Sequence, residues 1–397
     1  MTHRNHFMIL FAINFLITLG FGLSDTFFSV YLFELGARGT LLALPLISYS
    51  VAKTIFSPFV GRYADTLGPE RFLLVSLTLY LAVSVLYLLS TNLFILATSR
   101  LLQGVACAML RPVIVSVISE STVKEKRSSV MGTFDISFYS ALSIGPVVGG
   151  YIKDQFGFTA IFSGLILLTC IAIVLCSRLG SASPRAEAGH SSRLKRSSFM
   201  APITQSRHLR GLLAFIFGRA CCISITGTFL PIILTKELKL SGTQTGIVMA
   251  LSSLTITLLL RPMGLLADRI SHPLLITLGG IAVSITYLII PASTTLTQVI
   301  FATSLLGLFS ALSQPACTAM LVEEGSRYGV ENTVGIFNGA MNSGFIFGPI
   351  LGALILSRFG IDVVFYSAGL IGASTIVLFT LNTHPPLFSA IDNRCKN

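Results

Sequence analysis

Seven charged residues stand inside long apolar stretches of the sequence, where a charge is costly. They are Asp25, Lys53, Arg100, Arg111, Asp135, Arg219 and Arg261. In the core of a lipid bilayer a charge costs about 3 kcal/mol or more, so such residues usually face the interior of a helix bundle and carry function. A carboxylate that gains and loses a proton beside a guanidinium is the chemistry that these residue types offer. Arg261, beside a predicted helix end, is better explained as an interfacial anchor.

Asp25 and Arg100 are expected at matching depths. Asp25 continues a polar stripe with Asn14 and Thr18, at spacings of four and seven residues. At a rise of 1.5 Å per residue, Asp25 lies about 8 Å and Arg100 about 10 Å outward of the midpoint of its helix. The two residues therefore suit a protonatable ion pair, and a static pair that fixes one helix to another is the alternative. Arg111 and Asp135 share a depth nearer the cytoplasm and form a second candidate pair.

The elements that carry these charges are predicted to cross a membrane. Of the 397 residues, 53% are hydrophobic and only 11% are charged, whereas soluble domains contain about 25% charged residues. A helix needs about 20 apolar residues to span a bilayer. The first apolar run is too long for a signal peptide and lacks a cleavage site, so it is kept as a span. Twelve such runs cover residues 7–33, 41–61, 73–91, 94–119, 129–152, 158–177, 211–234, 243–265, 273–291, 297–321, 332–356 and 361–381.

The net charge of +11 is a signal of topology rather than of nucleic-acid binding. When the loops are assigned to alternate sides, 17 Lys and Arg residues fall on one side and five on the other. The positive-inside rule then predicts that both termini and the Ser- and Arg-rich segment 178–210 are cytoplasmic. We expect a protein of the plasma (inner) membrane with a first half at 1–177, a linker at 178–210 and a second half at 211–397, which ends in a short cytoplasmic tail.

The two halves repeat one another at a constant offset. Asp65 recurs 203 residues later as Asp268, Pro112 as Pro315, and Gly145-Pro146 as Gly348-Pro349. Several matches at one offset indicate a duplication. The expected fold is therefore an all-α integral membrane protein with twelve transmembrane helices in two six-helix pseudo-repeats, an arrangement typical of transporters that bind their substrate between the repeats.

Three motifs carry a family resemblance. The loop 61–71, with Gly61, Asp65 and Arg71, is similar to a G-x-x-x-D-R-x-G-R-K gating loop, although Thr66, Pro69 and Glu70 replace residues that are usually basic; its second copy contains Gly264, Asp268 and Arg269. Arg100-x-x-Gln103-Gly104 is similar to the R-x-x-Q-G motif. Over essentially its whole length the chain thus resembles the major facilitator superfamily, which associates the first motif with gating and the second with proton coupling.

The third motif is rich in glycine and proline. The segment Ala141-x-x-x-Gly145-Pro146-x-x-Gly149-Gly150 resembles the antiporter motif of twelve-helix drug:proton antiporters, with Ala141 in place of a glycine, and Gly344-x-x-x-Gly348-Pro349-x-x-Gly352 repeats it. Small residues let helices approach closely and proline bends them, which suits a bend that biases alternating access. Ordinary tight packing is the alternative.

The resemblance implies a secondary transporter that moves a small amphipathic organic solute by alternating access. Efflux by proton antiport, as in multidrug resistance, is the leading hypothesis. Proton-coupled uptake of an organic anion or nutrient is the alternative, and a transporter-like sensor or scaffold is the alternative outside transport. The proton-coupling candidates are Asp25, Arg100, Gln103, Asp135 and Arg111.

The interior polar residues bear on the substrate. Counting inward-facing charges without Arg261 gives two acids and four bases, which favours anionic, zwitterionic or neutral amphipathic solutes. Lys53 and Arg219 have no acid at their depth, so each either lines a cavity or bonds to backbone carbonyls. The candidate cavity residues are Asn14, Thr18, Tyr49, Lys53, Cys107, Arg219, Thr226, Asn338 and Asn342.

Other functions lack their usual motifs. The six His residues lie at termini, loops or helix ends, and the seven Cys residues have no even spacing, so neither a zinc site nor a disulfide framework is expected. We expect no enzyme activity, no catalytic residues, no metal and no cofactor, with a proton gradient as the energy source. The expected partners are the small-molecule substrate and membrane lipid, the chain acting as a monomer without nucleic acid.

Overall fold

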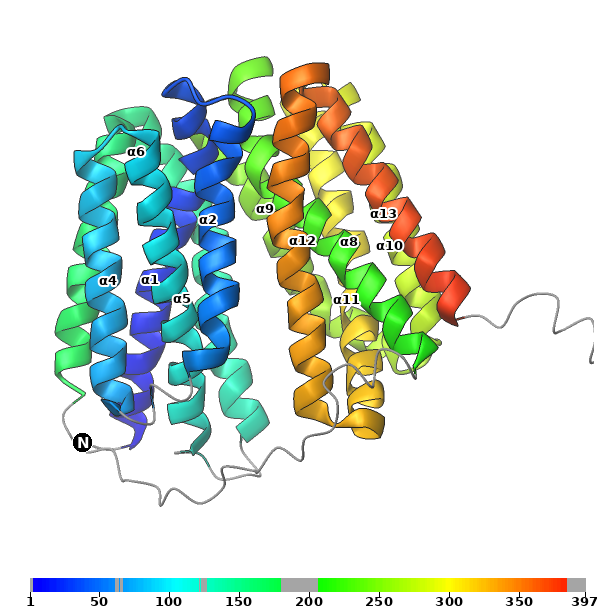
Figure 1. Cartoon of the computed structure of the whole chain (residues 1–397), viewed down its shortest axis with the longest axis horizontal. Helices are drawn as coiled ribbons and strands as arrows, with labels where there is room; N and C mark the ends of the chain where they lie inside the picture. The colour runs from blue at the N-terminus through cyan, green and yellow to red at the C-terminus, as the bar shows by residue number, and fades with distance from the viewer. Residues whose placement is uncertain are drawn as a thin grey trace, which may run out of the picture. The chain divides into compact units, whose positions relative to one another are not determined.

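A computed structural model of the chain describes residues 3–60, 64, 67–120, 122, 127–179 and 206–383. The described residues are almost entirely helical, as expected in lipid, where a helix satisfies every backbone N–H and C=O group internally. The first six helical elements are α1 (His3–Glu34), α2 (Thr40–Phe56), η1 (Ser57–Phe59), α4 (Pro69–Leu89), α5 (Leu93–Glu120) and α6 (Arg127–Ser177). The others are α8 (Arg207–Ile232), η3 (Ile233–Glu237), α9 (Gly242–Ala267), α10 (His272–Ile289), η4 (Ile290–Ala292), α11 (Leu296–Tyr328), α12 (Val330–Phe359) and α13 (Ile361–Thr383); Figure 1 labels the larger helices.

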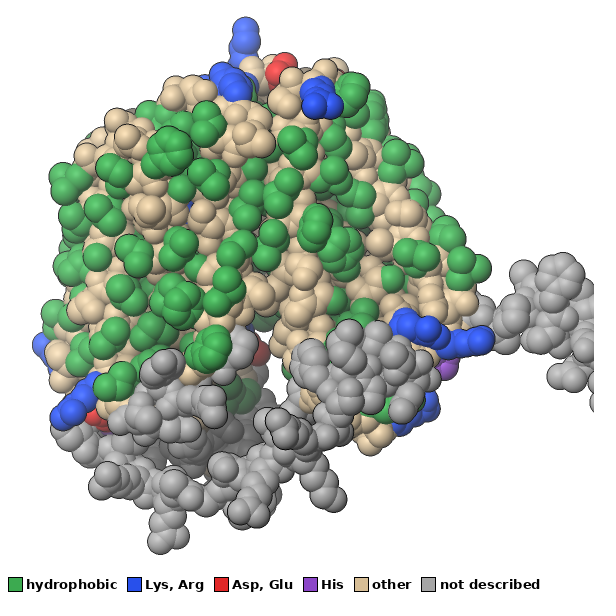
Figure 2. Space-filling model, viewed as in Figure 1, with side chains coloured by type: hydrophobic (Ala, Val, Ile, Leu, Met, Phe, Trp, Pro, Cys, Tyr) green, Lys and Arg blue, Asp and Glu red, His purple; other side chains and the backbone are tan. Residues whose placement is uncertain are grey.

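Ten of the described helices are long and apolar enough to cross a membrane, and the shorter Thr40–Phe56 is also apolar. Two of the predicted spans, 129–152 and 158–177, fall within α6, which is 51 residues long. Its backbone leaves the helical conformation at Gly157, where φ is 76°, so α6 consists of two helices joined at that glycine. Apolar side chains cover the sides of the helices and the visible Lys and Arg residues gather at helix ends (Figure 2).

The chain divides into two compact units. One comprises Met1–Ser191 together with Gly227–Ser253, and the other comprises Ser192–Thr226 together with Leu254–Asn397. Residues 227–253 form the end of α8, the η3 turn and the start of α9. They follow the predicted linker in sequence yet pack with the first unit; the division of the sequence at 178–210 stays a prediction. Most of that linker lies outside the described residues.

Close helix packing in the first unit depends on glycine. A Cβ atom on Gly145 of α6 would come within 2.6 Å of the Cα atom of Gly22 on α1, and one on Gly149 within 2.6 Å of the Leu23 carbonyl oxygen. These distances are far shorter than a van der Waals contact, so α1 and α6 approach as closely as they do because side chains are missing there. The Gly145-Pro146 segment therefore packs inside the first unit.

The matching segment of α12 packs in the same way inside the second unit. A Cβ atom on Gly348 would lie 2.7 Å from the Cys221 carbonyl oxygen on α8. Elsewhere in this unit α10 packs against α11 and α13. In both units a glycine-proline helix thus lies directly against the helix that begins the corresponding predicted half.

Candidate functional site

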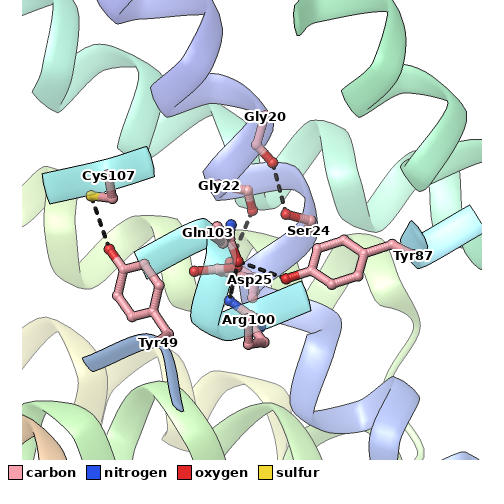
Figure 3. Close-up of polar contacts among 10 residues, drawn as sticks. Gly20, Gly22, Ser24, Asp25, Tyr49, Tyr87, Arg100, Gln103 and Cys107 are labelled. Atoms are coloured by element: carbon pink, nitrogen blue, oxygen red, sulfur yellow. Dashed lines mark hydrogen bonds and ion pairs between the residues drawn. The ribbon is translucent and has the colours of Figure 1, made fainter. Parts of the chain in front are cut away.

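The buried centre of the first unit is an ion pair between α1 and α5. Arg100 Nη1 donates to Asp25 Oδ1 at 2.5 Å and to Gln103 Oε1 at 3.1 Å. Tyr87, on α4, donates its hydroxyl to the same Gln103 oxygen at 2.7 Å, so three helices meet here (Figure 3). The side chain of Arg100 is 3% exposed and that of Asp25 is 24% exposed. The two residues predicted to share a depth therefore touch, and Gln103 joins them.

Aromatic rings complete the enclosure of Arg100. Its guanidinium carbon lies 3.7 Å from the ring centre of Phe28 and 5.8 Å from that of Tyr87, within the range of a cation–π contact. Among the described residues its Nε atom is buried without a hydrogen-bond partner. Removing one member of a buried ion pair generally costs about 3–5 kcal/mol, because the other charge is left uncompensated. A change in the charge of Asp25 is therefore costly unless Arg100 finds a new acceptor.

The second predicted pair also forms, in a different environment. Arg111 Nη2, on α5, donates to Asp135 Oδ1, on α6, at 2.9 Å. The side chains are 38% and 46% exposed, and the guanidinium of Arg111 lies 4.0 Å from the ring centre of Phe138. Exposed pairs contribute about 0–1 kcal/mol, so this pair separates far more readily than the pair at Asp25. One unit thus contains one locked and one accessible pair.

Other predicted residues of the first unit form contacts between helices. Tyr49 donates its hydroxyl to Cys107 Sγ at 3.1 Å, and the ammonium of Lys53 lies 5.8 Å from the Tyr49 ring centre. Asn14 donates to Ser137 Oγ at 2.7 Å and is 2% exposed, while Thr18 is 9% exposed. The burial of Asn14 and Thr18 differs from the cavity-lining position that the sequence predicts, because α6 packs over this stretch of α1.

In the second unit, Arg219 has a neutral partner. Its Nη2 atom donates to Gln314 Oε1, on α11, at 2.6 Å, and Thr226 Oγ1 lies 2.8 Å from the Tyr287 hydroxyl, on α10. A small cavity within this unit is lined by both Arg219 and Tyr287, together with Cys222, Ser284 and Thr375 among others. Gln314 is not predicted from the sequence, because a neutral residue does not stand out among polar helix residues.

The remaining predicted residues are exposed, half-buried or outside the described residues. On α12, Asn338 is exposed and Asn342 half-buried, and neither forms an interhelical hydrogen bond among the residues with described placement. Gly61 and Asp65 lie outside the described residues, whereas Arg71 is exposed on α4. In the second copy of the loop, the Asp268 amide donates to the Gly264 carbonyl, and both Asp268 and Arg269 are exposed.

Comparison with known proteins assigns the family. The sequence profile of the Major Facilitator Superfamily matches residues 10–232 and again residues 212–391. The chain belongs to the major facilitator superfamily. It is therefore a multi-pass membrane transporter and not an enzyme.

Individual relatives cover different parts of this major facilitator protein. Multidrug resistance protein 2 of Bacillus subtilis (strain 168) is 26% identical over 376 residues, which is 92% of each chain. The quinolone resistance protein NorA of Staphylococcus aureus is 29% identical over 152 residues, 38% of this chain and 39% of NorA. The crystal structure of the nucleoside transporter NupG superposes with a TM-score of 0.77, at 14% identity, over 96% of this chain and 100% of NupG. The last likeness supports the fold alone.

One acidic site of this major facilitator protein is not predicted from its sequence. Asp154, near the Gly157 break, accepts hydrogen bonds from the amides of Gly242 and Thr243 at 2.6 and 2.7 Å, and from Thr243 Oγ1 at 2.7 Å. A few residues before Gly242 in the sequence, Lys236 Nζ donates to Glu34 Oε1 at 2.9 Å. These bonds hold residues 227–253 in the first unit. The Ser-Gly-Thr start of α9 was the available signal, since the first N–H groups of a helix need acceptors.

A second missed acid lies in the other unit. Glu324, on α11, is 2% exposed and accepts a 2.5 Å hydrogen bond from Ser206 Oγ, which also accepts from the Leu209 amide at the start of α8. His208 and Arg327 approach Glu324 at 3.9 and 3.4 Å. No group of three or more His, Cys, Asp or Glu residues suited to a metal ion occurs within the described ranges.

Proposed function

We propose that this transporter exports a small amphipathic organic solute from the cell by proton antiport. The observation that carries the proposal is the buried Asp25–Arg100 pair, which is extended by Gln103 and lies between helices of one unit. The similarity to Multidrug resistance protein 2 along 92% of the chain supports efflux as the direction. No cofactor enters this scheme, because the proton gradient supplies the energy.

Coupling follows from the charge of Asp25. With Asp25 ionised, its carboxylate holds Arg100; with Asp25 protonated, that attraction falls to an ordinary hydrogen bond and Arg100 needs another acceptor. An anionic group of the substrate or a helix carbonyl can serve. Since burying an uncompensated guanidinium is costly, proton binding at Asp25 and the rearrangement around Arg100 have to occur together. Asp135 beside Arg111 is the second candidate for the coupling acid.

The test is Asp25→Asn, which imitates the protonated acid. We expect this variant in lipid vesicles to lose accumulation driven by an imposed pH gradient, while exchange of substrate down its own gradient persists. The matched control is Asp362→Asn, an exposed acid in the first turn of α13, which should remain fully coupled. Driven transport at the wild-type level in Asp25→Asn, normalised to folded protein, would overturn Asp25 as the coupling acid.

A second candidate function is proton-coupled uptake of an organic anion or nutrient. The intramembrane charges without Arg261 comprise two acids and four bases, and Lys53 in the first unit lies beside the Tyr49 ring; this balance favours an anionic solute. The sign of the pH gradient that drives accumulation separates uptake from export. Transport without any proton movement would contradict both, and absence of transport would favour a sensor or scaffold.

We also propose twelve transmembrane helices in two six-helix repeats, acting as a monomer in the plasma membrane. Ten long spans, the shorter helix α2 and the break in α6 at Gly157 support this count. The packing of α6 on α1 and of α12 on α8 supports the repeat. Reporter fusions within 178–210 should signal a cytoplasmic location for the linker, as should fusions at either terminus; a signal from the outer face would refute the topology.

A further inference from the structure

The Arg111–Asp135 pair combines opposite charges with exposure. Both residues lie within predicted spans, yet their side chains are 38% and 46% exposed. A charge exposed at membrane depth generally faces a water-filled interior rather than lipid. Arg111 reaches Asp135 Oδ1 through Nη2, and a guanidinium has five N–H donors. Within the described part of the chain, most of these donors remain open to a ligand.

Two aromatic rings lie beside the pair. The Arg111 guanidinium lies 4.0 Å from the Phe138 ring centre, and the Tyr139 ring lies 5.4 Å from the Phe138 ring, edge to face. Both aromatic residues are half-buried. A ligand with a flat apolar body can therefore contact rings while its polar groups meet the charges.

We propose that Arg111 and Asp135 form the binding site for a zwitterionic amphiphile, its anionic group on Arg111 and its cationic group on Asp135. This inference rests on the proposed transport function and names its substrate class. A zwitterion replaces one ion pair by two. A monoanion would occupy Arg111 and leave Asp135 without a partner, and a monocation would do the reverse. Ligand specificity is such a difference between competing states.

Other charged groups of the first unit shape the preference among singly charged ligands. Asp25 and Arg100 neutralise each other at 2.5 Å. Lys53, on α2, has the Tyr49 ring as its neighbour at 5.8 Å and adds a positive charge. We therefore expect the wild-type protein to prefer the zwitterion, then the anion, then the cation.

Three xanthene dyes test this order, because they share a flat body and differ in charge. Rhodamine B is zwitterionic at neutral pH, its ethyl ester is cationic, and fluorescein is anionic. Equilibrium binding to the purified full chain in lipid nanodiscs, read by fluorescence anisotropy, requires neither a gradient nor coupling. We expect rhodamine B to bind at least about tenfold more tightly than its ester, because the ester lacks the carboxylate that pairs with Arg111. A tenfold difference in affinity corresponds to about 1.4 kcal/mol.

Variants of the pair should shift selectivity in opposite directions. Arg111→Gln should weaken the binding of rhodamine B and strengthen the binding of its cationic ester. Asp135→Asn should instead favour the binding of fluorescein over the other two dyes. The exchanged double variant, Arg111→Asp with Asp135→Arg, should restore the preference for rhodamine B. Arg261→Gln and Asp362→Asn remove exposed charges of the same signs outside the pair and should leave the order unchanged.

Each outcome decides the inference separately from the coupling proposal. Equal affinity of the wild-type protein for rhodamine B and its ester overturns the zwitterion site, as does an order unaffected by Arg111→Gln and Asp135→Asn. If the variants fail to fold, the wild-type order alone is decisive. Failure of gradient-driven transport in wild-type vesicles would contradict proton antiport, while selective dye binding would still support the site.

Discussion

At the scale of single residues, Arg100 is held from three directions. The Asp25 carboxylate, the Gln103 amide oxygen and the Phe28 ring all contact its guanidinium. Because these neighbours lie on α1 and α5, Arg100 changes partner only if a helix moves or a charge is neutralised. Protonation of Asp25, which the proposed coupling requires, would remove one of these charges without moving a helix.

The Tyr87 hydroxyl supports this arrangement from α4. Tyr87→Phe keeps the ring beside Arg100 and removes the 2.7 Å bond to Gln103. We expect the free energy of unfolding to fall by about 1 kcal/mol, the usual net value of a buried hydrogen bond. Thermal unfolding of the purified protein measures the loss, and Tyr366→Phe, at an exposed position of α13, is the matched control. Equal losses in both variants would argue against a specific role for the Tyr87 hydroxyl.

At this scale, the sequence predicts the depth of a residue along its helix better than it predicts which residues the side chain contacts. The residue positions along each helix predict matching depths for Asp25 and Arg100 and for Arg111 and Asp135. The structure contains both ion pairs. Rotation about a helix axis is harder to infer, so Asn14 was expected to line a cavity and is instead bonded to Ser137. Asp154 was missed because its partners lie 88 and 89 residues away, beyond any pattern within one helix.

At the scale of helices, α6 shows why the glycine segments matter. Gly145 leaves no space for a methyl group, whereas a Cβ atom on Gly164, beyond the Gly157 break in α6, meets nothing within 4 Å. The apolar runs predicted these helices and most of their extents. What they could not predict is which glycine faces a neighbour, since all glycines read alike in a sequence.

The two glycines therefore form a matched pair of substitutions. Gly145→Ala should destabilise the protein by about 1–3 kcal/mol through overpacking against Gly22. Gly164→Ala should be neutral or slightly stabilising, because alanine favours the helix by about 0.5–1 kcal/mol over glycine. Thermal unfolding under identical conditions compares them. Similar melting temperatures for the two variants would mean that α6 and α1 do not pack as described.

At the scale of the whole molecule, the contacts of Asp154 join segments on either side of the predicted linker. Alternating access requires the two halves of the sequence to move relative to one another. Asp154→Cys with Thr243→Cys should form a disulfide, since the parent side chains touch at 2.7 Å. We expect oxidation to stop transport and a reducing agent to restore it.

Each single-cysteine variant, oxidised in parallel, controls for the native thiols. Full transport by the cross-linked double variant would mean that α9 keeps its contact with Asp154 throughout the cycle. The segment 227–253 would then move permanently with the first unit, and α8 and α9 would have to bend where they leave it.

The composition of the two units has a consequence for how mutations act. By sequence, residues 227–253 belong to the second half, but they pack as part of the first unit. This resembles the exchange of elements between domain-swapped protomers. A chain cut at the linker would therefore yield two fragments of which neither contains the whole first unit. The boundary between the two halves of the sequence and the boundary between the two packed units therefore lie at different places. A substitution in the second half of the sequence, at Thr243 or Lys236, changes the stability of the first unit.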